Sequence, residues 1–309
     1  MFNVTILGCG SATPSLRHFP SSQIINYRDN LMMVDCGEGA QLQMRRFKAK
    51  YSRLNHIFIS HLHGDHLLGL PGLLSTLALH GKTGTVTVYM LQRGIDLMKP
   101  VVDFLCGERP YTLVWQPIDP KGGVILETQS LTIEAIKLYH RVPTVGFIFR
   151  EKEHLRHIRS EECKFWNVPT CFYNRLREGE DFVTEDGRTI SNDLLTSAST
   201  PERSYAYCSD TRFDTRVAEE VKGVDVIYHE ATYLDNENAL AAERYHSTAA
   251  QAAEIARLAG AKMLVLGHYS KRYVSLDGHR DEARKIFPES VTADEGMVID
   301  IENLCVEKR

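Results

Sequence analysis

Short apolar runs recur along the chain, and many of them are separated by stretches with helical periodicity. Runs of roughly four to eight apolar or alternating residues are typical of β-strands. The sequence predicts ten such strands, at Val4–Leu7, Leu31–Val34, His56–Ser60, Thr85–Met90, Leu131–Leu138, Gly146–Phe149, Tyr205–Cys208, Val224–Tyr228, Met263–Leu266 and Met297–Ile301. Because strands follow one another in places and alternate with helices elsewhere, we expect sheets packed on each other with helices outside.

Three segments between these strands carry signals of helices. They lie at Gly37–Phe47, Pro71–His80 and Thr248–Ala259. Pro71 is suited to a first helical turn. Thr248 is followed three positions later by Gln251, a spacing that predicts a capping box, and Gly260 is a natural helix stop.

One segment, residues 151–200, departs from the pattern because it is polar and charged and has few strand-like runs. Residues 150–177 contain four glutamates and seven basic residues, namely Arg150, Lys152, Arg156, Arg159, Lys164, Arg175 and Arg177. The interleaved aromatic residues are Phe165, Trp166, Phe172 and Tyr173. Such a mixture favours contacts with nucleic acid, while the alternative is a solvated excursion of ordinary mixed charge. We interpret the segment as an arm inserted into a core of residues 1–150 and 201–309.

Composition limits the possible classes of protein. A chain of 309 residues that is 43% hydrophobic can bury one large core, with or without an accessory element. The net charge of −4 excludes a polycation, so binding of nucleic acid would need local basic patches. Seven scattered cysteines without a C-x-x-C pair favour reduced thiols. With no secretory signal and no run of membrane-spanning length, a cytoplasmic protein with no membrane partner is expected.

The segment His61–His66, with the sequence HLHGDH, contains three imidazoles and one carboxylate directly after an apolar run. These ligands suit zinc and other borderline divalent ions, and the absence of thiolate argues against a structural cysteine-rich site. In an extended chain His61 and His63 point to the same side and can bind one ion. The motif therefore predicts a catalytic metal centre; the alternative is a polar loop with one or two surface histidines.

Three further candidates occupy the same kind of position. His140, Asp210 and His268 each follow an apolar strand, so we expect them to converge with the motif at one sheet edge. Taken singly, each could be an ordinary hydrogen-bonded residue. Together they would suit two metal ions, which lower the pKa of water and orient its attack on a phosphoester.

These residues follow the pattern of the metallo-β-lactamase-fold hydrolases, and the chain resembles the ribonuclease Z family in particular. Four local matches support the narrower resemblance, at Val4–Pro14, His229–Thr232 (HEAT), His246–Thr248 (HST) and Gly267–Tyr273. The matches span nearly the whole chain. The resemblance implies an α+β fold, a four-layer αβ/βα sandwich with an inserted arm.

The resemblance also implies roles for individual residues. His61, His63 and His140 would bind one zinc ion. Asp65, His66 and His268 would bind a second, with Asp210 as the bridge. Asp65 would also accept a proton from the attacking water. His246, assisted by Glu230, would help to protonate the leaving 3′ oxygen, a contribution typically worth about 10²–10⁴-fold.

The partner implied by the resemblance is precursor tRNA, cut after the discriminator region to leave a 3′-hydroxyl. The family is homodimeric, and the arm of one subunit serves substrate held at the other. Two segments depart from the family pattern: Val168-Pro169 stands where a Gly-Pro step is common, and Pro14–His18 differs from the usual loop.

Two other functions remain open at this point. One is a small-molecule phosphodiesterase, thioesterase or arylsulfatase of the same fold, which shares the metal motif and needs no arm. The other is a non-catalytic RNA-binding protein in which zinc only holds the fold, although structural zinc sites are usually rich in cysteine.

Overall fold

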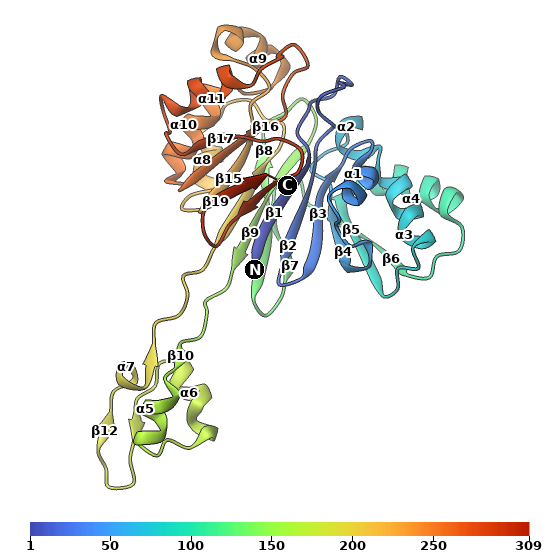
Figure 1. Cartoon of the computed structure of the whole chain (residues 1–309). Helices are drawn as coiled ribbons and strands as arrows, with labels where there is room; N and C mark the ends of the chain where they lie inside the picture. Colours follow the sequence, from blue (N-terminus) through green and yellow to red (C-terminus); the bar gives the residue numbers. More distant parts are fainter. Residues whose placement is uncertain (309) are drawn as a thin grey trace. The chain divides into compact units, whose positions relative to one another are not determined.

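Two β-sheets face each other, and helices cover their outer faces (Figure 1). The structure is a computed structural model that describes residues 1–308. It divides into two units: a core unit of residues 1–127, 133–149 and 204–309, and an arm unit of residues 128–132 and 150–203. The predicted insertion, residues 151–200, lies within the arm unit.

The first sheet has eight strands, in the order β19-β18-β1-β2-β3-β4-β5-β6. The strands β3 to β6 pair in parallel, and β19 to β3 pair antiparallel. Their bounds are β1 (Phe2–Gly8), β2 (Ser22–Tyr27), β3 (Asn30–Cys36), β4 (Leu54–Phe58), β5 (Thr85–Leu91), β6 (Thr112–Ile118), β18 (Met297–Asp300) and β19 (Cys305–Lys308).

The second sheet has seven strands, in the order β17-β16-β15-β14-β9-β8-β7. The strands β14 to β17 pair in parallel, so their carboxyl ends meet at one edge of the sheet. Their bounds are β7 (Gly123–Glu127), β8 (Leu131–Leu138), β9 (Thr144–Glu151), β14 (Ser204–Cys208), β15 (Val226–Glu230), β16 (Met263–Gly267) and β17 (Ser290–Thr292).

Helices pack on each sheet. The first sheet contacts α1 (Ala40–Arg46), α2 (Gly64–Leu67) and α4 (Gln92–Cys106), and α3 (Leu70–Leu79) packs on α1 and α4. The second sheet contacts α10 (Ala249–Ala259) and α11 (Asp277–Arg284), and α8 (Thr215–Glu220) packs on α10. Helix α9 (Asn238–Arg244) and the short 3₁₀ helices η1 (Tyr51–Arg53) and η3 (Asp235–Glu237) connect these elements. The predicted four-layer sandwich is confirmed.

Aromatic side chains fill the space between the two sheets. The ring of Phe58 in the first sheet lies 5.5 Å from that of Phe147 and 5.7 Å from that of Phe149 in the second, measured between centroids. All three rings are buried. This contact joins the strand before the HLHGDH motif to the opposite sheet and thereby positions the motif.

Each of the ten predicted strands is present, with ends that shift by a few residues. The three predicted helices are also present. The Thr248 hydroxyl accepts from the Gln251 backbone amide, and the Gln251 side chain accepts from the Thr248 backbone amide. The predicted capping box is therefore confirmed. Helix α4 is not among the predicted helices, because Gly94 and Pro100 lower the intrinsic preference for helix. Its buried residues Ile95, Met98 and Val102 lie at helical spacing, and packing on α3 and the first sheet stabilises it.

The arm unit has short elements around a small core of its own. They are β10 (His157–Ile158), α5 (Ser160–Phe165), η2 (Thr170–Phe172), α6 (Tyr173–Arg177), β11 (Phe182–Val183), β12 (Thr189–Ile190), α7 (Asn192–Leu195) and β13 (Thr196–Ser197). Six buried side chains form this core, namely Cys163, Val168, Leu176, Phe182, Ile190 and Leu195. Trp166, Phe172 and Tyr173 pack against it, whereas Phe165 is 73% exposed.

This packing corrects part of the compositional argument, because three of the four arm aromatics are used inside the arm. Four of its cations are also held by carboxylates, in the pairs Arg156–Asp193, Lys164–Glu161, Arg175–Glu180 and Arg188–Asp186. Residues 150–203 contain nine Lys and Arg against eleven Asp and Glu. The basic excess seen in residues 150–177 therefore does not extend to the whole unit.

All seven cysteines are free thiols. Within residues 1–308, no helix combines the length and the apolar character that crossing a membrane requires.

Candidate metal centre

The strands deliver the candidate ligands to one place in the core unit. The HLHGDH motif follows β4, His140 follows β8, Asp210 follows β14 and His268 follows β16. Glu230 ends β15, and His246 lies between α9 and α10. The structure thus brings all nine predicted site residues together, most of them from the carboxyl ends of strands in the two sheets.

A first group of ligand atoms comes from three histidines and one aspartate. The Nδ1 atom of His63 lies 3.0 Å from Nε2 of His61 and 3.3 Å from Nε2 of His140. Oδ2 of Asp210 lies 3.7 Å from Nε2 of His61 and 3.8 Å from Nε2 of His140. These four atoms lie within 4.8 Å of one another, a spacing that one ion could span.

A second group lies on the other side of the same aspartate. Oδ1 of Asp210 lies 3.1 Å from Nε2 of His268 and 3.3 Å from Nε2 of His66. Both of these nitrogens also lie 3.3 Å from Oδ2 of Asp65. Asp210 therefore presents one carboxylate oxygen to each group.

Hydrogen bonds to the other ring nitrogen set the tautomer of four histidines. Nδ1 of His140 donates to the carbonyl of Tyr245 at 2.8 Å, which leaves Nε2 unprotonated and directed at the centre. Nδ1 of His66 donates in the same way to Asp35, at 2.7 Å. Nδ1 of His61 is hydrogen-bonded to Ser60 Oγ at 3.1 Å. Nδ1 of His268 is hydrogen-bonded to Thr232 Oγ1 at 2.9 Å.

Asp35 is a supporting residue that the motif analysis missed. Its carboxylate accepts from His66, from the amide and hydroxyl of Ser60, and from the hydroxyl of Tyr207, at 2.6–2.9 Å. Asp35 is buried and has a φ of 54°, a conformation that is costly for a residue with a side chain. It could have been found from the sequence, since it comes directly after the predicted apolar run Leu31–Val34; in the structure it lies near the end of β3.

Electrostatics favour the metal-binding forms of most of these groups. Burial lowers the pKa of His61, His63 and His140, which keeps these imidazoles neutral. Burial would raise the pKa of Asp65 and Asp210, but the surrounding histidines hold both well below the usual range. These two carboxylates therefore stay ionised, as metal ligands must.

The donor set fits divalent cations. Nε2 of His66 and Oδ1 of Asp210 are buried and have no hydrogen-bond partner among the described residues. An unsatisfied buried polar atom costs about 1–3 kcal/mol. A cation between them would satisfy both, and ligands of imidazole and carboxylate suit zinc and related ions.

Glu230 and His246 form a pair at the edge of the centre. Oε1 of Glu230 accepts from Nδ1 of His246 at 2.7 Å, and its other oxygen accepts from the Thr232 hydroxyl at 2.6 Å. Burial alone would lower the pKa of His246, but the Glu230 carboxylate raises it to about 9. The pair therefore holds a proton beside the centre.

Ser247 is not part of the helix cap, because its hydroxyl donates to the carbonyl of Thr211 at 2.7 Å.

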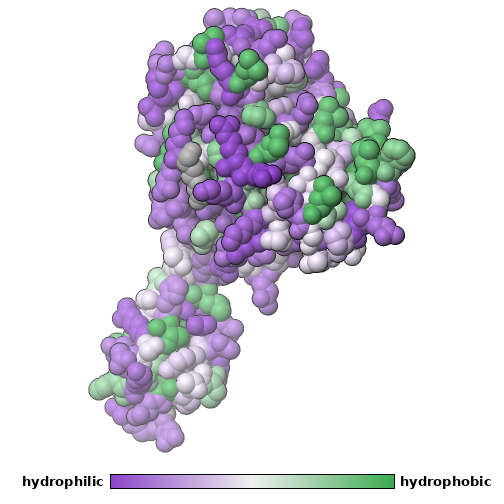
Figure 2. Space-filling view, turned by 45° about the vertical axis from the view of Figure 1, so that its right-hand side comes forward, coloured by the Kyte–Doolittle hydropathy of each residue, from purple (hydrophilic) through white to green (hydrophobic). Residues whose placement is uncertain are grey.

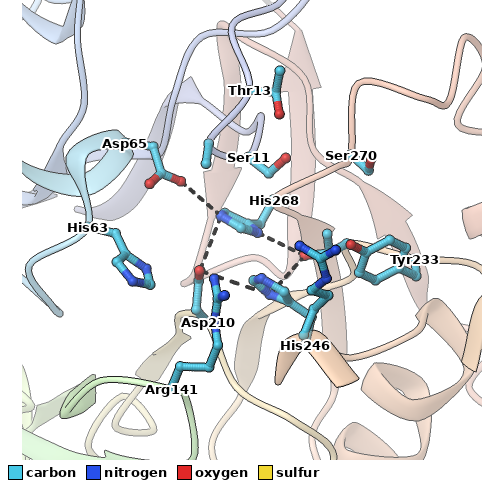
Figure 3. Close-up of a pocket in the computed structure, with 13 residues that line it drawn as sticks. Ser11, Thr13, His63, Asp65, Arg141, Asp210, Tyr233, His246, His268 and Ser270 are labelled. Carbon is cyan, nitrogen blue, oxygen red and sulfur yellow. Dashed lines mark hydrogen bonds and ion pairs between the residues drawn. The ribbon is translucent and has the colours of Figure 1, made fainter. Parts of the chain in front are cut away.

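A pocket of about 180 Å³ opens over these groups (Figure 3). Besides the site residues it is lined by Ser11, Thr13, Tyr233, Ser270 and two arginines, Arg141 and Arg244. Figure 3 shows Arg141 beside Asp210, on the side of the pocket opposite Thr13. Sequence reasoning did not single out Arg141, Tyr233 or Arg244, because they become neighbours of the site only through the fold.

Comparisons with known proteins agree with this geometry. A family described as "Anti-Pycsar protein Apyc1" matches residues 2–99, and one described as "Beta-lactamase superfamily domain" matches residues 175–269. A ribonuclease Z of Phocaeicola vulgatus is 47% identical over 304 residues, which cover 98% of each chain. The chain belongs to the ribonuclease Z family.

Two further ribonuclease Z relatives extend the match. One from Porphyromonas gingivalis is 47% identical over 97% of this chain and 99% of its own. The crystal structure of the short form of human tRNase Z has a TM-score of 0.71 and 25% identity, over 97% of this chain and 99% of that one. The predicted resemblance to ribonuclease Z is confirmed, and the His and Asp groups of the fold suggest a metal cofactor.

Proposed function

We propose that this chain is an endoribonuclease that removes the 3′ trailer of precursor tRNA by hydrolysis and leaves a 3′-hydroxyl. One observation carries the proposal: Asp210 lies between two groups of His and Asp ligands, beside the Glu230–His246 pair, in a chain 47% identical to ribonuclease Z over almost its full length.

Two zinc ions per subunit would be held by the two groups. His61, His63 and His140 would bind one, Asp65, His66 and His268 the other, and Asp210 both, because its two oxygens face different groups. When bound, such ions lower the pKa of water and polarise phosphoryl oxygens.

The protein's own groups would then move the protons. Asp65 is ionised and borders the pocket, so it can accept a proton from the attacking water. Nδ1 of His246 is committed to Glu230, which leaves Nε2 as the atom that delivers a proton to the leaving 3′ oxygen. Glu230 holds the ring in this orientation and keeps it protonated.

Other residues would bind and orient the phosphodiester. Arg141 and Arg244 line the pocket and can neutralise phosphate oxygens. The ring of Tyr233 lies 6.1 Å from that of His246 between centroids and closes one side of the pocket. A pocket of about 180 Å³ suits a phosphate group better than a folded RNA helix, so the rest of the substrate must bind outside it.

The deciding experiment is incubation with an unprocessed tRNA, with and without a chelator, followed by mapping of both new ends. We expect chelator-sensitive cleavage near the discriminator, a 3′-hydroxyl on the tRNA and a 5′-phosphate on the trailer. Hydrolysis of small phosphodiesters or thioesters with no cut in tRNA would instead favour the small-molecule hydrolase. RNA binding without any hydrolysis would favour the non-catalytic reading.

We further propose that the protein is a homodimer. Helices α1, α3 and α4 expose large hydrophobic side chains, among them Leu42 (62% exposed), Leu79 (85%) and Phe104 (88%). Figure 2 shows hydrophobic clusters on the face of the core unit that carries these helices. A second copy would bury them.

Light scattering tests this assembly. We expect wild type to have the mass of a dimer and Phe104→Asp to shift towards the monomer. The matched control is Phe165→Asp, which changes an exposed aromatic of the arm unit and should leave the mass unchanged. A wild-type monomer at micromolar concentration would contradict the proposal.

The arm unit is proposed to contact tRNA held at the partner subunit's site. Its support is narrower than the composition indicated, because many arm cations are internally paired. Arg159 and Arg177 are exposed and remain candidates for phosphate contacts. The cytoplasmic location stays a prediction from the sequence.

A further inference from the structure

A second hollow of about 500 Å³ lies next to the metal pocket in the core unit. It runs along the carboxyl end of β8 and the loop after it, and His140 and Arg141 form part of its wall. Arg141 lines both hollows, so the two adjoin at this side chain. We call the second hollow the β8 groove.

The β8 groove is strongly cationic. Four basic residues line it, namely Lys121, Lys137, Arg141 and Arg212, and its lining within the described chain contains no aspartate or glutamate. All four side chains belong to exposed residues. The chain as a whole has a net charge of −4, so four cations without acidic neighbours in one lining are a local exception to its charge. Such a surface favours an anionic ligand.

Two tyrosines lie among these cations. The Arg212 guanidinium is 5.7 Å from the ring centroid of Tyr245, and Lys137 Nζ is 5.4 Å from that of Tyr139. Arg216 lies 4.2 Å from the Tyr139 ring but is paired with Asp214, so it supports the ring more than it offers charge. Tyrosine rings and cations side by side are what contacts with single-stranded nucleic acid use, for base stacking and phosphate neutralisation.

The groove is also tied to the metal centre by hydrogen bonds. The carbonyl of Tyr245 accepts from Nδ1 of His140 at 2.8 Å, and the Arg212 amide donates to the carbonyl of Tyr139 at 2.9 Å. A ligand in the groove therefore lies against residues that immediately flank candidate metal ligands. Its position is set by the same loops that position His140 and Asp210.

We propose that the β8 groove binds the single-stranded 3′ trailer of the substrate, directly beyond the scissile phosphate. This inference rests on the proposed function. A volume of about 500 Å³ is in the range of roughly 300–1,000 Å³ typical of small-ligand sites, which admits one or two nucleotides and not a duplex. On the 5′ side of the cut, the tRNA continues as the paired acceptor stem, whereas the 3′ trailer is unpaired. The trailer is therefore the part of the substrate that fits the groove.

The test compares two precursor tRNAs that differ only in the trailer, one with a single nucleotide and one with a long unpaired trailer. The variant is Lys121→Ala/Lys137→Ala. We expect KM for the long-trailer substrate to rise roughly tenfold with kcat unchanged, and the salt dependence of binding to weaken. The single-nucleotide substrate should be cleaved as by wild type, because it does not reach these lysines.

The matched control is Lys222→Ala/Lys285→Ala, which removes the same charge from exposed lysines outside the groove lining. It should cleave both substrates like wild type. Equal weakening of both substrates by the groove variant would place the groove on the mature tRNA and overturn the proposal, and no weakening of either would overturn RNA binding there. Failure of wild type to cut either substrate would instead refute the proposed function.

Discussion

The residues that contact one another in the metal centre are far apart in the sequence, whereas those in the arm unit are close together. In the centre, Nε2 of His268 lies 3.3 Å from Oδ2 of Asp65, although 203 positions separate the two residues. In the arm unit, all six buried core residues lie between Cys163 and Leu195. The centre therefore exists only when both sheets are assembled, whereas the arm unit forms its core from neighbouring sequence.

This difference separates chemistry from recognition of a large substrate. A change in the centre should affect every substrate, because every phosphodiester must meet the same Asp and His groups. A change in the arm unit should affect only substrates large enough to reach it. The following experiments test that division, from the largest expected effect to the smallest.

Replacing Asp65 with alanine should reduce cleavage of precursor tRNA and of a small phosphodiester alike, by about 10⁴-fold or more. The carboxylate faces both His66 and His268, so its loss removes a proposed metal ligand and the proton acceptor together. Circular dichroism should show an intact fold. The matched control is Asp193→Ala, an exposed arm carboxylate that should leave small-ester hydrolysis unchanged; substantial activity in Asp65→Ala would contradict the assignment.

Replacing residues 153–200 with a short Gly-Ser linker should impair tRNA cleavage by about 10²–10³-fold, chiefly through KM, because phosphate contacts would be lost. Hydrolysis of a small phosphodiester should stay within about twofold of wild type. The deletion is practicable because the Glu151 amide donates to the carbonyl of Arg203 at 2.9 Å, so the flanking segments already lie together. Equal loss with both substrates would mean that the arm unit supports the fold and is no exosite.

Glu230→Gln should lower kcat for tRNA by about 10²-fold, because His246 loses the carboxylate that orients it and keeps it protonated. His246→Gln should have a similar effect, and the double variant should be no worse than either single one, since the two act as a unit. Steady-state kinetics of the three variants measure this coupling. Multiplied losses in the double variant would show that the two residues act independently.

A buried histidine gives the smallest effect, which concerns stability. Burial lowers the pKa of His279 to about 4, whereas an unfolded histidine titrates near 6.5. As pH falls from about 6.5 to 4, only the unfolded chain takes up this proton, so the folded state loses stability, by about 2 kcal/mol at pH 5. Urea unfolding at pH 7 and pH 5 should show a smaller loss in His279→Phe than in wild type, while exposed His157→Phe should behave like wild type.

Much of the fold could be read from the sequence, because its strands are apolar and its best helix is capped. Thr248, Gln251 and Gly260 specify the start and end of α10 by local hydrogen bonds and backbone preference. The helix α4 could not be read in this way. Its Gly94 and Pro100 lower the intrinsic preference for helix, and packing against α3, β5 and β6 compensates for them.

For the site, the sequence by itself determined the kind of chemistry, since HLHGDH and the strand-end residues are ligands for divalent metal ions whatever the fold. Tertiary structure decided how they combine. It gave the two oxygens of Asp210 to different groups, placed Asp35 behind His66, and set Glu230 2.7 Å from His246. It also joined the cations of the β8 groove to the pocket at Arg141. The physical reason is distance along the chain: ligand type is a local property, whereas the direction of a lone pair or a charge depends on strands that pair only when both sheets have formed.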